Sequence, residues 1–337
     1  MPCGMYVANQ DFTGQIGPES KTCRNQIMNV QRTVRREISC RSIALHSGRK
    51  VGMTIRPAEM NQGIVFRRCD VNGKNVIKAS WDNVSDTTLA TTIGNNGTAV
   101  STIEHLMSAL CGMGVDNAVV EVDAPEIPIM DGSALPFVSL LKEAGTVVQG
   151  KGKKALVVNR EVSVSDQSGT ASLLPAEEFK ITYKIDFPHP LIGQQSYEMI
   201  FSDALYEREI APARTFGFLK DVEYLQAKGL ALGGSLKNAV VLDEKNIINK
   251  EGLRFHDEFV KHKILDAIGD LSLLGMPIVG HFVACKSGHR LNNRLLRELL
   301  ARSENWTIVD SADQTGGRRK SSLKASGFRI LDAIRAI

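Results

Sequence analysis

One predicted helix carries three reactive side chains on a single face. His262, Asp266 and Asp270 follow one another at intervals of four residues, which places them along one stripe of an α-helix. The remaining residues of this segment are largely apolar, so we expect a mostly buried helix, in which charged groups must be paired or bound to metal. A histidine and a carboxylate at this spacing can bind one cation. The same spacing fits an ordinary His–Asp pair, and it leaves both interpretations open.

An internal repeat connects this helix with a second segment. Alignment of Ala109 with Ala267 pairs the segment that begins at Glu104 with the segment that begins at His262. In each half, the predicted helix is followed by an apolar strand, a glycine-containing loop and a second amphipathic helix. The repeated order indicates a duplication, which predicts two α+β domains whose first helices face each other across a shared cleft.

The repeat places Glu104 and His105 opposite the His262 helix. His105, His262 and Asp266 would then supply three ligands and leave a fourth position for water, as in a catalytic zinc site. A glutamate beside a metal-bound water commonly acts as the general base, which makes Glu104 a candidate for that role. The alternatives are that Glu104 forms a capping box with Ser101 at the start of its helix and that His105 packs in the core.

His289 lies in a polar loop between a predicted buried strand and a predicted helix. A histidine on a loop that a rigid scaffold positions is a candidate general acid, because imidazole titrates near neutral pH. Asp270 is the predicted partner that would orient this imidazole or shift its pKa. A surface histidine without a function is the alternative interpretation.

Short strands and a few helices must position these residues. Apolar periodicity and glycine punctuation predict strands at 33–40, 51–57, 63–68, 89–93, 119–122, 156–164, 171–174, 179–187 and 278–285, and helices at 101–112, 135–144, 257–274 and 291–302. An insertion with helix and strand character is expected at about 213–241. The basic, glycine-containing segment 150–154 separates the two halves.

The composition fits a globular protein of two domains. The chain has 337 residues, 43% of them hydrophobic and 23% charged, which argues against a disordered or fibrous chain. It contains no apolar run of the roughly 18–20 residues that a membrane helix needs and no secretory signal. The net charge of +4 is spread along the chain, so we expect no nucleic-acid partner. Six cysteines without a CxxC pair predict reduced thiols and a cytoplasmic protein.

Six segments together resemble the zinc-dependent UDP-3-O-acyl-N-acetylglucosamine deacetylase family of lipid A biosynthesis. They occur in the family's order and are Ser101-Thr-Ile-Glu-His-Leu, Ala124-Pro-Glu-Ile-Pro-Ile-Met-Asp-Gly-Ser-Ala, Ala213-Arg-Thr-Phe-Gly-Phe, Leu232-Gly-Gly-Ser, Phe259-Val-Lys-His-Lys-Ile-Leu-Asp-Ala-Ile-Gly-Asp-Leu and Lys286-Ser-Gly-His. The resemblance extends from about Gln31 to Asp310. The segments before and after this range have no counterpart in the family pattern.

The resemblance implies an α+β fold of two similar two-layer sandwich domains, each with a small insert, with the active site between them. On this basis we expect an N-terminal extension at 1–30, domain I at 31–149, domain II at 150–310 with its insert at about 213–241, and a poorly ordered tail at 311–337. The insert matches the one that forms a passage for the acyl chain in the family.

The resemblance also implies a role for individual residues. It assigns Zn²⁺ to His105, His262 and Asp266. It makes Glu104 the general base and His289 the general acid of a hydrolytic reaction.

Four further positions match the family pattern. Asp270 would support His289. Thr215 matches the position whose hydroxyl helps to hold the developing oxyanion. Lys263 and Phe216 match positions that contact the substrate, and the lysine would supply a charge for an anionic ligand.

The implied reaction is hydrolysis of the N-acetyl group of UDP-3-O-(3-hydroxyacyl)-N-acetylglucosamine, with release of acetate, at an early committed step of lipid A biosynthesis. The implied partner is this UDP-linked acylated glucosamine, and we expect a monomer that spans no membrane. Two alternatives are a different mononuclear metal enzyme with a two-His-one-Asp site, such as an iron oxygenase, and a basic module that binds nucleic acid or anionic membranes.

Overall fold

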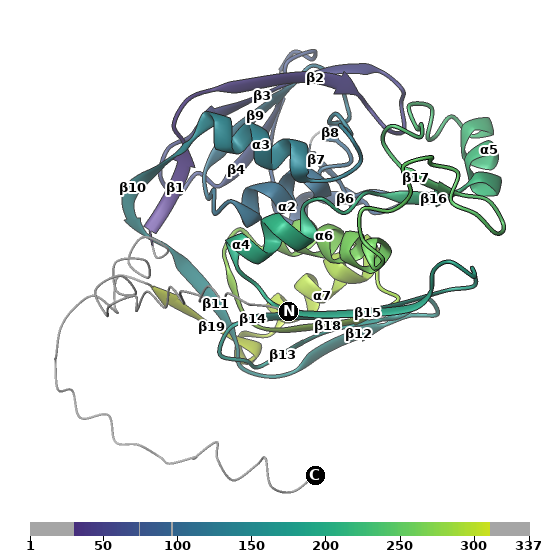
Figure 1. Ribbon diagram of the computed structural model, residues 1–337. Coiled ribbons are helices and arrows are strands. Elements are labelled where there is room, and N and C mark those ends of the chain that lie inside the picture. The colour runs from purple at the N-terminus through teal and green to yellow at the C-terminus, as the bar shows by residue number, and fades with distance from the viewer. Residues whose placement is uncertain (1–29, 74, 96, 311–337) are drawn as a thin grey trace, which may run out of the picture.

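The computed structural model describes residues 30–310, apart from residues 74 and 96. The expected N-terminal extension, up to residue 29, and the expected poorly ordered tail at 311–337 lie outside the described residues. The described part of the chain forms two large sheets and several small ones, with helices between the large sheets (Figure 1).

The first half of the described chain builds a five-stranded sheet and two helices. The sheet has the order β2–β3–β9–β4–β5, with β9 antiparallel to β3 and parallel to β4. The elements are β2 (Ile38–Ile43), β3 (Lys50–Pro57), β4 (Ile64–Arg68), β5 (Val76–Lys78), α2 (Glu104–Gly112), β9 (Ala118–Val122) and α3 (Leu135–Ala144). Met53 and Ile55 of β3 alternate with more exposed residues and join the hydrophobic core, as expected for a sheet with one covered face.

The second half builds a seven-stranded sheet and two helices. The sheet has the order β12–β13–β18–β11–β19, and β14 joins β18 and carries β15 on its other side. The elements are β11 (Lys154–Val158), β12 (Val162–Ser165), β13 (Thr170–Leu174), β14 (Phe179–Phe187), β15 (Gly193–Ile200), α6 (Glu258–Ser272), β18 (Ile278–Cys285), α7 (His289–Ala301) and β19 (Trp306–Asp310). Phe282 of β18 is fully buried in the core beneath the helices.

The helices α2 and α6, which carry most of the predicted site residues, meet at the centre of the molecule. In Figure 1 the two large sheets lie outside and these helices lie between them. The helices approach so closely at Gly269 that a Cβ atom there would lie 2.1 Å from the carbonyl oxygen of Glu104. The expected α+β fold is confirmed, and the first helices of the two halves are in contact, as the repeat predicts.

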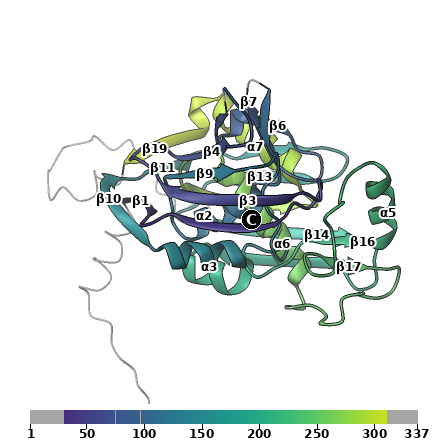
Figure 2. The ribbon, with the colours of Figure 1, turned by 90° about the horizontal axis from the view of Figure 1, so that it is seen from above.

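Each half also contains a small insert. The first consists of β6 (Val84–Asp86), β7 (Thr92–Asn95) and β8 (Thr98–Val100), which form a three-stranded sheet. The second consists of β16 (Phe216–Phe218), α5 (Leu219–Ala227) and β17 (Val240–Leu242), with β16 parallel to β17. Figure 2 shows the second insert at one side of the molecule, where none of the α5 residues is buried.

Two predicted strands are divided in the structure, and the segment predicted to separate the two halves lies in strands. The strand predicted at 33–40 is two strands, β1 (Val30–Val34) and β2, and the strand predicted at 156–164 is β11 and β12. The segment 150–154, expected to separate the two halves, belongs almost entirely to β10 (Thr146–Gly152), which pairs with β1, and to β11. These differences arise because pairing with distant strands, which a local pattern does not encode, decides where a strand ends.

Short elements complete the fold. They are a helical turn α4 (Asp203–Leu205), a π-helical turn (Tyr206–Ile210) and 3-10 turns at Trp81–Asn83 and Ser303–Asn305. Within residues 30–310, with the two gaps noted above, we find no helix with the length and hydropathy of a membrane span.

Candidate active site

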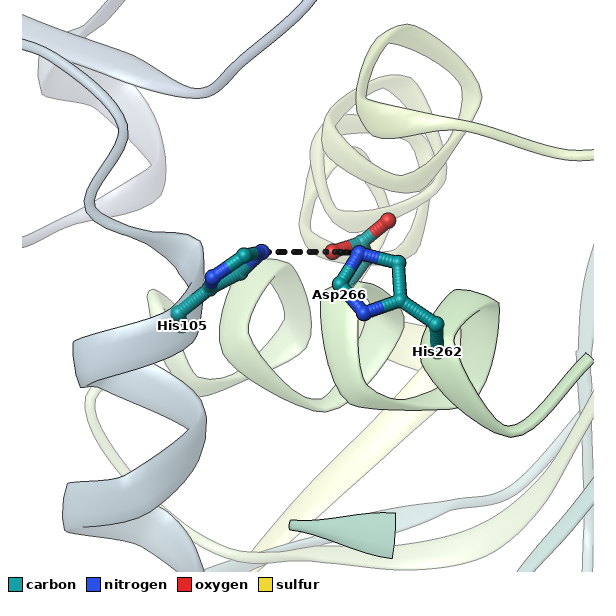
Figure 3. Close-up of side chains that lie close together, drawn as sticks. All are labelled: His105, His262 and Asp266. Carbon is teal, nitrogen blue, oxygen red and sulfur yellow. Dashed lines mark ion pairs between the residues drawn. The ribbon is translucent and has the colours of Figure 1, made fainter. Parts of the chain in front are cut away.

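Two histidines and one aspartate converge where α2 meets α6 (Figure 3). His105 projects from α2, and His262 and Asp266 project from α6. Oδ1 of Asp266 lies 3.5 Å from Nε2 of His105 and 3.4 Å from Nε2 of His262, and the three ligand atoms lie within 4.8 Å of one another. A tetrahedral zinc ion with bonds of about 2.0–2.1 Å separates its ligand atoms by about 3.3–3.5 Å. The trio therefore has the spacing of a metal site.

Hydrogen bonds from neighbouring groups orient two members of this trio. Nδ1 of His262 lies 3.0 Å from the carbonyl oxygen of Ala213, and donation from Nδ1 leaves the Nε2 lone pair available to a cation. Nζ of Lys263 donates to Oδ2 of Asp266 at 2.8 Å. That bond leaves Oδ1 of the carboxylate beside the two imidazoles.

Burial and charge give the trio the protonation states that metal binding needs. Burial lowers the pKa of His262 to about 4, against the opposing charge of Asp266, so the imidazole is neutral near pH 7. Burial also raises the pKa of the Asp266 carboxyl, but His262 and Lys263 outweigh it and hold this pKa well below its ordinary value. Nδ1 of His105 is buried and has no hydrogen-bond partner among the described residues. Imidazole nitrogens with one carboxylate oxygen are a donor set that suits a divalent transition metal.

Glu104 precedes His105 and is almost fully buried, with 3% of its surface exposed. Oε2 accepts the backbone N–H of Thr91 at 3.0 Å, and Oε1 lies 3.9 Å from Nε2 of His289. Burial raises the pKa of Glu104, while the neighbouring His289 and His105 act in the opposite direction. A carboxylate with a raised pKa beside a metal site is suited to accept a proton.

The capping box considered for this helix is wrong. Ile103 precedes α2, and no side chain within the described part of the chain caps its first turn. Ser101 instead forms a strand bridge with Glu126, and its hydroxyl oxygen accepts a hydrogen bond from Thr92. The Glu104 carboxylate instead accepts the backbone N–H of Thr91.

His289 is the first residue of α7 and does not lie in the loop predicted for it. Nδ1 of its ring lies 2.9 Å from Oδ2 of Asp270, and the same oxygen accepts Nδ2 of Asn292 at 2.9 Å. Burial alone would lower the pKa of His289, but Asp270 and Glu104 outweigh it and raise the pKa to about 9. The imidazole is therefore protonated near pH 7, with Nε2 beside the Glu104 carboxylate.

Phe216, the first residue of β16 in the second insert, lies beside His262, and Thr215 precedes it in the chain. The backbone N–H of Thr215 donates to the carbonyl oxygen of Gly132 at 2.8 Å. Gly132 adopts a φ of 85°, and a Cβ atom there would lie 2.1 Å from the carbonyl oxygen of Asn238, so only glycine fits this contact. The ring of Phe216 lies 6.3 Å from that of His262.

A buried ion pair holds the segment that contains Thr215. Arg214 donates to Oε1 of Glu258 from Nε at 2.8 Å and from its backbone N–H at 3.0 Å, and Glu258 is fully buried. The same segment supplies the Ala213 carbonyl that accepts from His262. The pair therefore fixes the backbone beside His262.

The structure brings the three predicted metal ligands together with Glu104, His289 and Asp270 in one buried cluster. Lys263 is hydrogen-bonded to Asp266 at the edge of this cluster. Sequence reasoning missed Asn292 and Thr91, which both donate to Asp270. Asn292 follows His289 by one helical turn, and this spacing was a usable signal. Thr91 carried no such signal, because 179 residues separate it from Asp270.

Comparison with known proteins gives the family of this chain. The sequence model of the UDP-3-O-acyl N-acetylglycosamine deacetylase family matches residues 31–301. This chain belongs to that deacetylase family. The protein named UDP-3-O-acyl-N-acetylglucosamine deacetylase in Syntrophus aciditrophicus is 62% identical, and the match covers 92% of this chain and 100% of that protein. Proteins of the same name in Myxococcus xanthus and Alcanivorax borkumensis are 52% and 49% identical, over 83% and 85% of this chain and 89% and 94% of their own lengths.

The range matched by the deacetylase family contains every site residue that the sequence predicts. The family consists of metalloenzymes, which agrees with the trio of His105, His262 and Asp266. The resemblance stated from the six sequence segments is therefore confirmed.

Proposed function

We propose that this protein hydrolyses the N-acetyl group of UDP-3-O-(3-hydroxyacyl)-N-acetylglucosamine and releases acetate, an early committed step of lipid A biosynthesis. The observation that carries the proposal is a buried His-His-Asp trio flanked by Glu104 and His289, in a chain of the deacetylase family. A hydrolase of an amide needs an activated water, a proton acceptor and a proton donor, and this cluster contains side chains suited to each task.

His105, His262 and Asp266 would hold one Zn²⁺ ion. Two imidazole nitrogens and one carboxylate oxygen within 4.8 Å of one another support zinc, since this set leaves a fourth position open. When bound, zinc polarises a carbonyl and lowers the pKa of its water. The hydrogen bonds from His262 to Ala213 and from Lys263 to Asp266 orient the ligand atoms toward the proposed zinc position.

Glu104 is the proposed general base. Its carboxylate takes a proton from the attacking water as the oxygen adds to the amide carbon. The Thr91 N–H fixes Oε2, and Oε1 lies on the side of His289. Because burial raises its pKa, the carboxylate is a stronger base than an exposed glutamate.

His289 is the proposed general acid. It gives its Nε2 proton to the amide nitrogen as the carbon–nitrogen bond breaks, so that acetate and a free amine leave the site. The bond from Nδ1 to Asp270 holds the ring and favours its charged form. The 3.9 Å separation of Nε2 from Glu104 puts the acid and the base on one side of the site.

Other residues would bind the substrate. The Thr215 hydroxyl would stabilise the oxyanion, Lys263 would offer a positive charge to the anionic substrate, and Phe216 would contact the sugar. The insert at about 213–241 would bind the acyl chain, since it exposes large apolar side chains, among them Leu219, Tyr224 and Leu232.

Four further expectations stand beside this function. The domain division at 31–149 and 150–310 is supported by the separate large sheets of the two halves. We also propose a monomer, a cytoplasmic location and no nucleic-acid partner.

The test is acetate release from the UDP-linked acylated substrate by the purified full chain. We expect turnover that a chelator abolishes and that added Zn²⁺ restores. The substrate without its acyl chain is the matched control and should turn over more slowly, because binding energy from remote groups contributes to rate. Metal-dependent activity without acetate release would instead favour another two-His-one-Asp enzyme.

The pH profile of kcat should be bell-shaped, because Glu104 must be ionised and His289 protonated. Activity should fall as the pH drops through the raised pKa of Glu104. Activity should also fall as the pH rises toward the His289 pKa of about 9, and the positive charge of a bound metal should move this limb to lower pH. In His289→Ala, kcat should fall about 10²–10⁴-fold and the alkaline limb should vanish.

The matched control for this profile is His281→Ala. His281 lies on β18, and its Nε2 contacts the Thr182 hydroxyl at 2.8 Å rather than Asp270 or Glu104. This variant should keep the wild-type profile. A wild-type kcat and an unchanged alkaline limb in His289→Ala would show that another group donates the proton.

A further inference from the structure

Thr91 connects the two groups to which proton transfer is assigned. It precedes β7 in the small insert of the first half and is buried, with 2% of its surface exposed. Its backbone N–H donates to Oε2 of Glu104 at 3.0 Å, and its hydroxyl donates to Oδ1 of Asp270 at 2.6 Å. A single residue therefore contacts the carboxylate of the general base and the carboxylate that holds the general acid.

The hydrogen bond from the Thr91 hydroxyl fixes the orientation of the Asp270 carboxylate. Oδ2 of Asp270 accepts from both His289 and Asn292, and Thr91 binds the other oxygen. The 2.6 Å separation is in the range of a hydroxyl bound to a carboxylate. Without the hydroxyl, Oδ1 would lose its donor and the carboxylate could rotate about its terminal bond, whose torsional preference is broad.

We propose that Thr91 is a positioning residue for catalysis, which acts by fixing the Asp270 carboxylate and, through it, the His289 ring beside Glu104. This inference rests on the proposed function. The residue comes from the insert of one half of the chain, and Asp270 comes from the central helix of the other half. The hydroxyl thereby ties the orientation of the general acid to the position of the first insert.

The test compares Thr91→Val, which removes the hydroxyl at nearly constant volume, with Thr91→Ser, which keeps it. Neither change removes the backbone N–H that binds Glu104. We expect kcat of Thr91→Val to fall about 10–100-fold, the size of effect seen when outer partners of a catalytic site are removed. KM and metal content should stay near wild type, and Thr91→Ser should recover most of kcat.

The matched control is Thr92→Val. The Thr92 hydroxyl donates to Ser101 and not to the proton-transfer groups, so this variant should keep the wild-type kcat. Each variant is first compared with the wild type in its thermal midpoint. If Thr91→Val does not fold, Thr91→Ala removes the same hydroxyl with less crowding, and the same fall in kcat is expected.

A double-variant measurement separates positioning from general support of the fold. In a His289→Ala background, Thr91→Val should change kcat by less than about twofold, because residues that act through one another are not additive. A full additional loss in that background would indicate a merely structural role. Wild-type kcat in Thr91→Val would also overturn the inference, whereas absence of acetate release by the wild-type protein would overturn the proposed function and this inference together.

Discussion

Asp266→Ala should lose bound metal and activity together. Asp266 contributes the oxygen that lies 3.5 Å and 3.4 Å from the two imidazole nitrogens, and its removal leaves two of three protein ligands. A metal supplies several kcal/mol of transition-state stabilisation, and each 1.36 kcal/mol is about tenfold in rate. We therefore expect kcat to fall by about 10³-fold or more, and the same result for His105→Ala and His262→Ala.

Two measurements on the purified variants check this expectation. They are the metal content, by elemental analysis, and the rate of acetate release. The control is Asp257→Asn, which changes a carboxyl at the start of the same helix that pairs with Lys261. It should keep both metal and activity. Full metal occupancy in any of the three variants would remove that residue from the ligand set.

The grouping of His105, His262 and Asp266 could be predicted from the sequence because two signals combined. The interval of four residues puts His262 and Asp266 on one face of a helix, and the internal repeat placed His105 opposite them. Helical periodicity can be read from a short segment, so it predicts which residues share a helix face without knowledge of the tertiary fold. The geometry followed because α2 and α6 come into contact at Gly269.

Other parts of the site depend on contacts that no local pattern encodes. The Ala213 carbonyl that orients His262 is a backbone atom, present in every residue type. Thr91 reaches Asp270 across the two halves of the chain. The capping-box pattern at Ser101 and Glu104 was misleading, because strand pairing of Ser101 outweighed the local preference. The predicted strand boundaries were wrong for the same reason, since β10 and β11 pair with strands far away in the sequence.

A variant of Glu104 can separate metal binding from proton transfer. Glu104 is not among the three residues whose ligand atoms converge, so Glu104→Gln should retain the metal. The amide oxygen can still accept the Thr91 N–H, which preserves this hydrogen bond of the carboxylate. Among residues 30–310, apart from 74 and 96, no side chain caps α2, so the substitution removes no cap. The thermal midpoint should therefore stay close to that of the wild type.

Turnover of Glu104→Gln should nevertheless fall about 10²–10⁴-fold, because an amide cannot accept the proton that the attacking water releases. The loss should be in kcat, since proton transfer occurs only on the way to the transition state. The acid limb of the pH profile should disappear, because that limb reports protonation of the Glu104 carboxylate, whose pKa burial raises. Loss of metal from this variant would make Glu104 a ligand, and near-wild-type kcat with the metal retained would assign the base to another group.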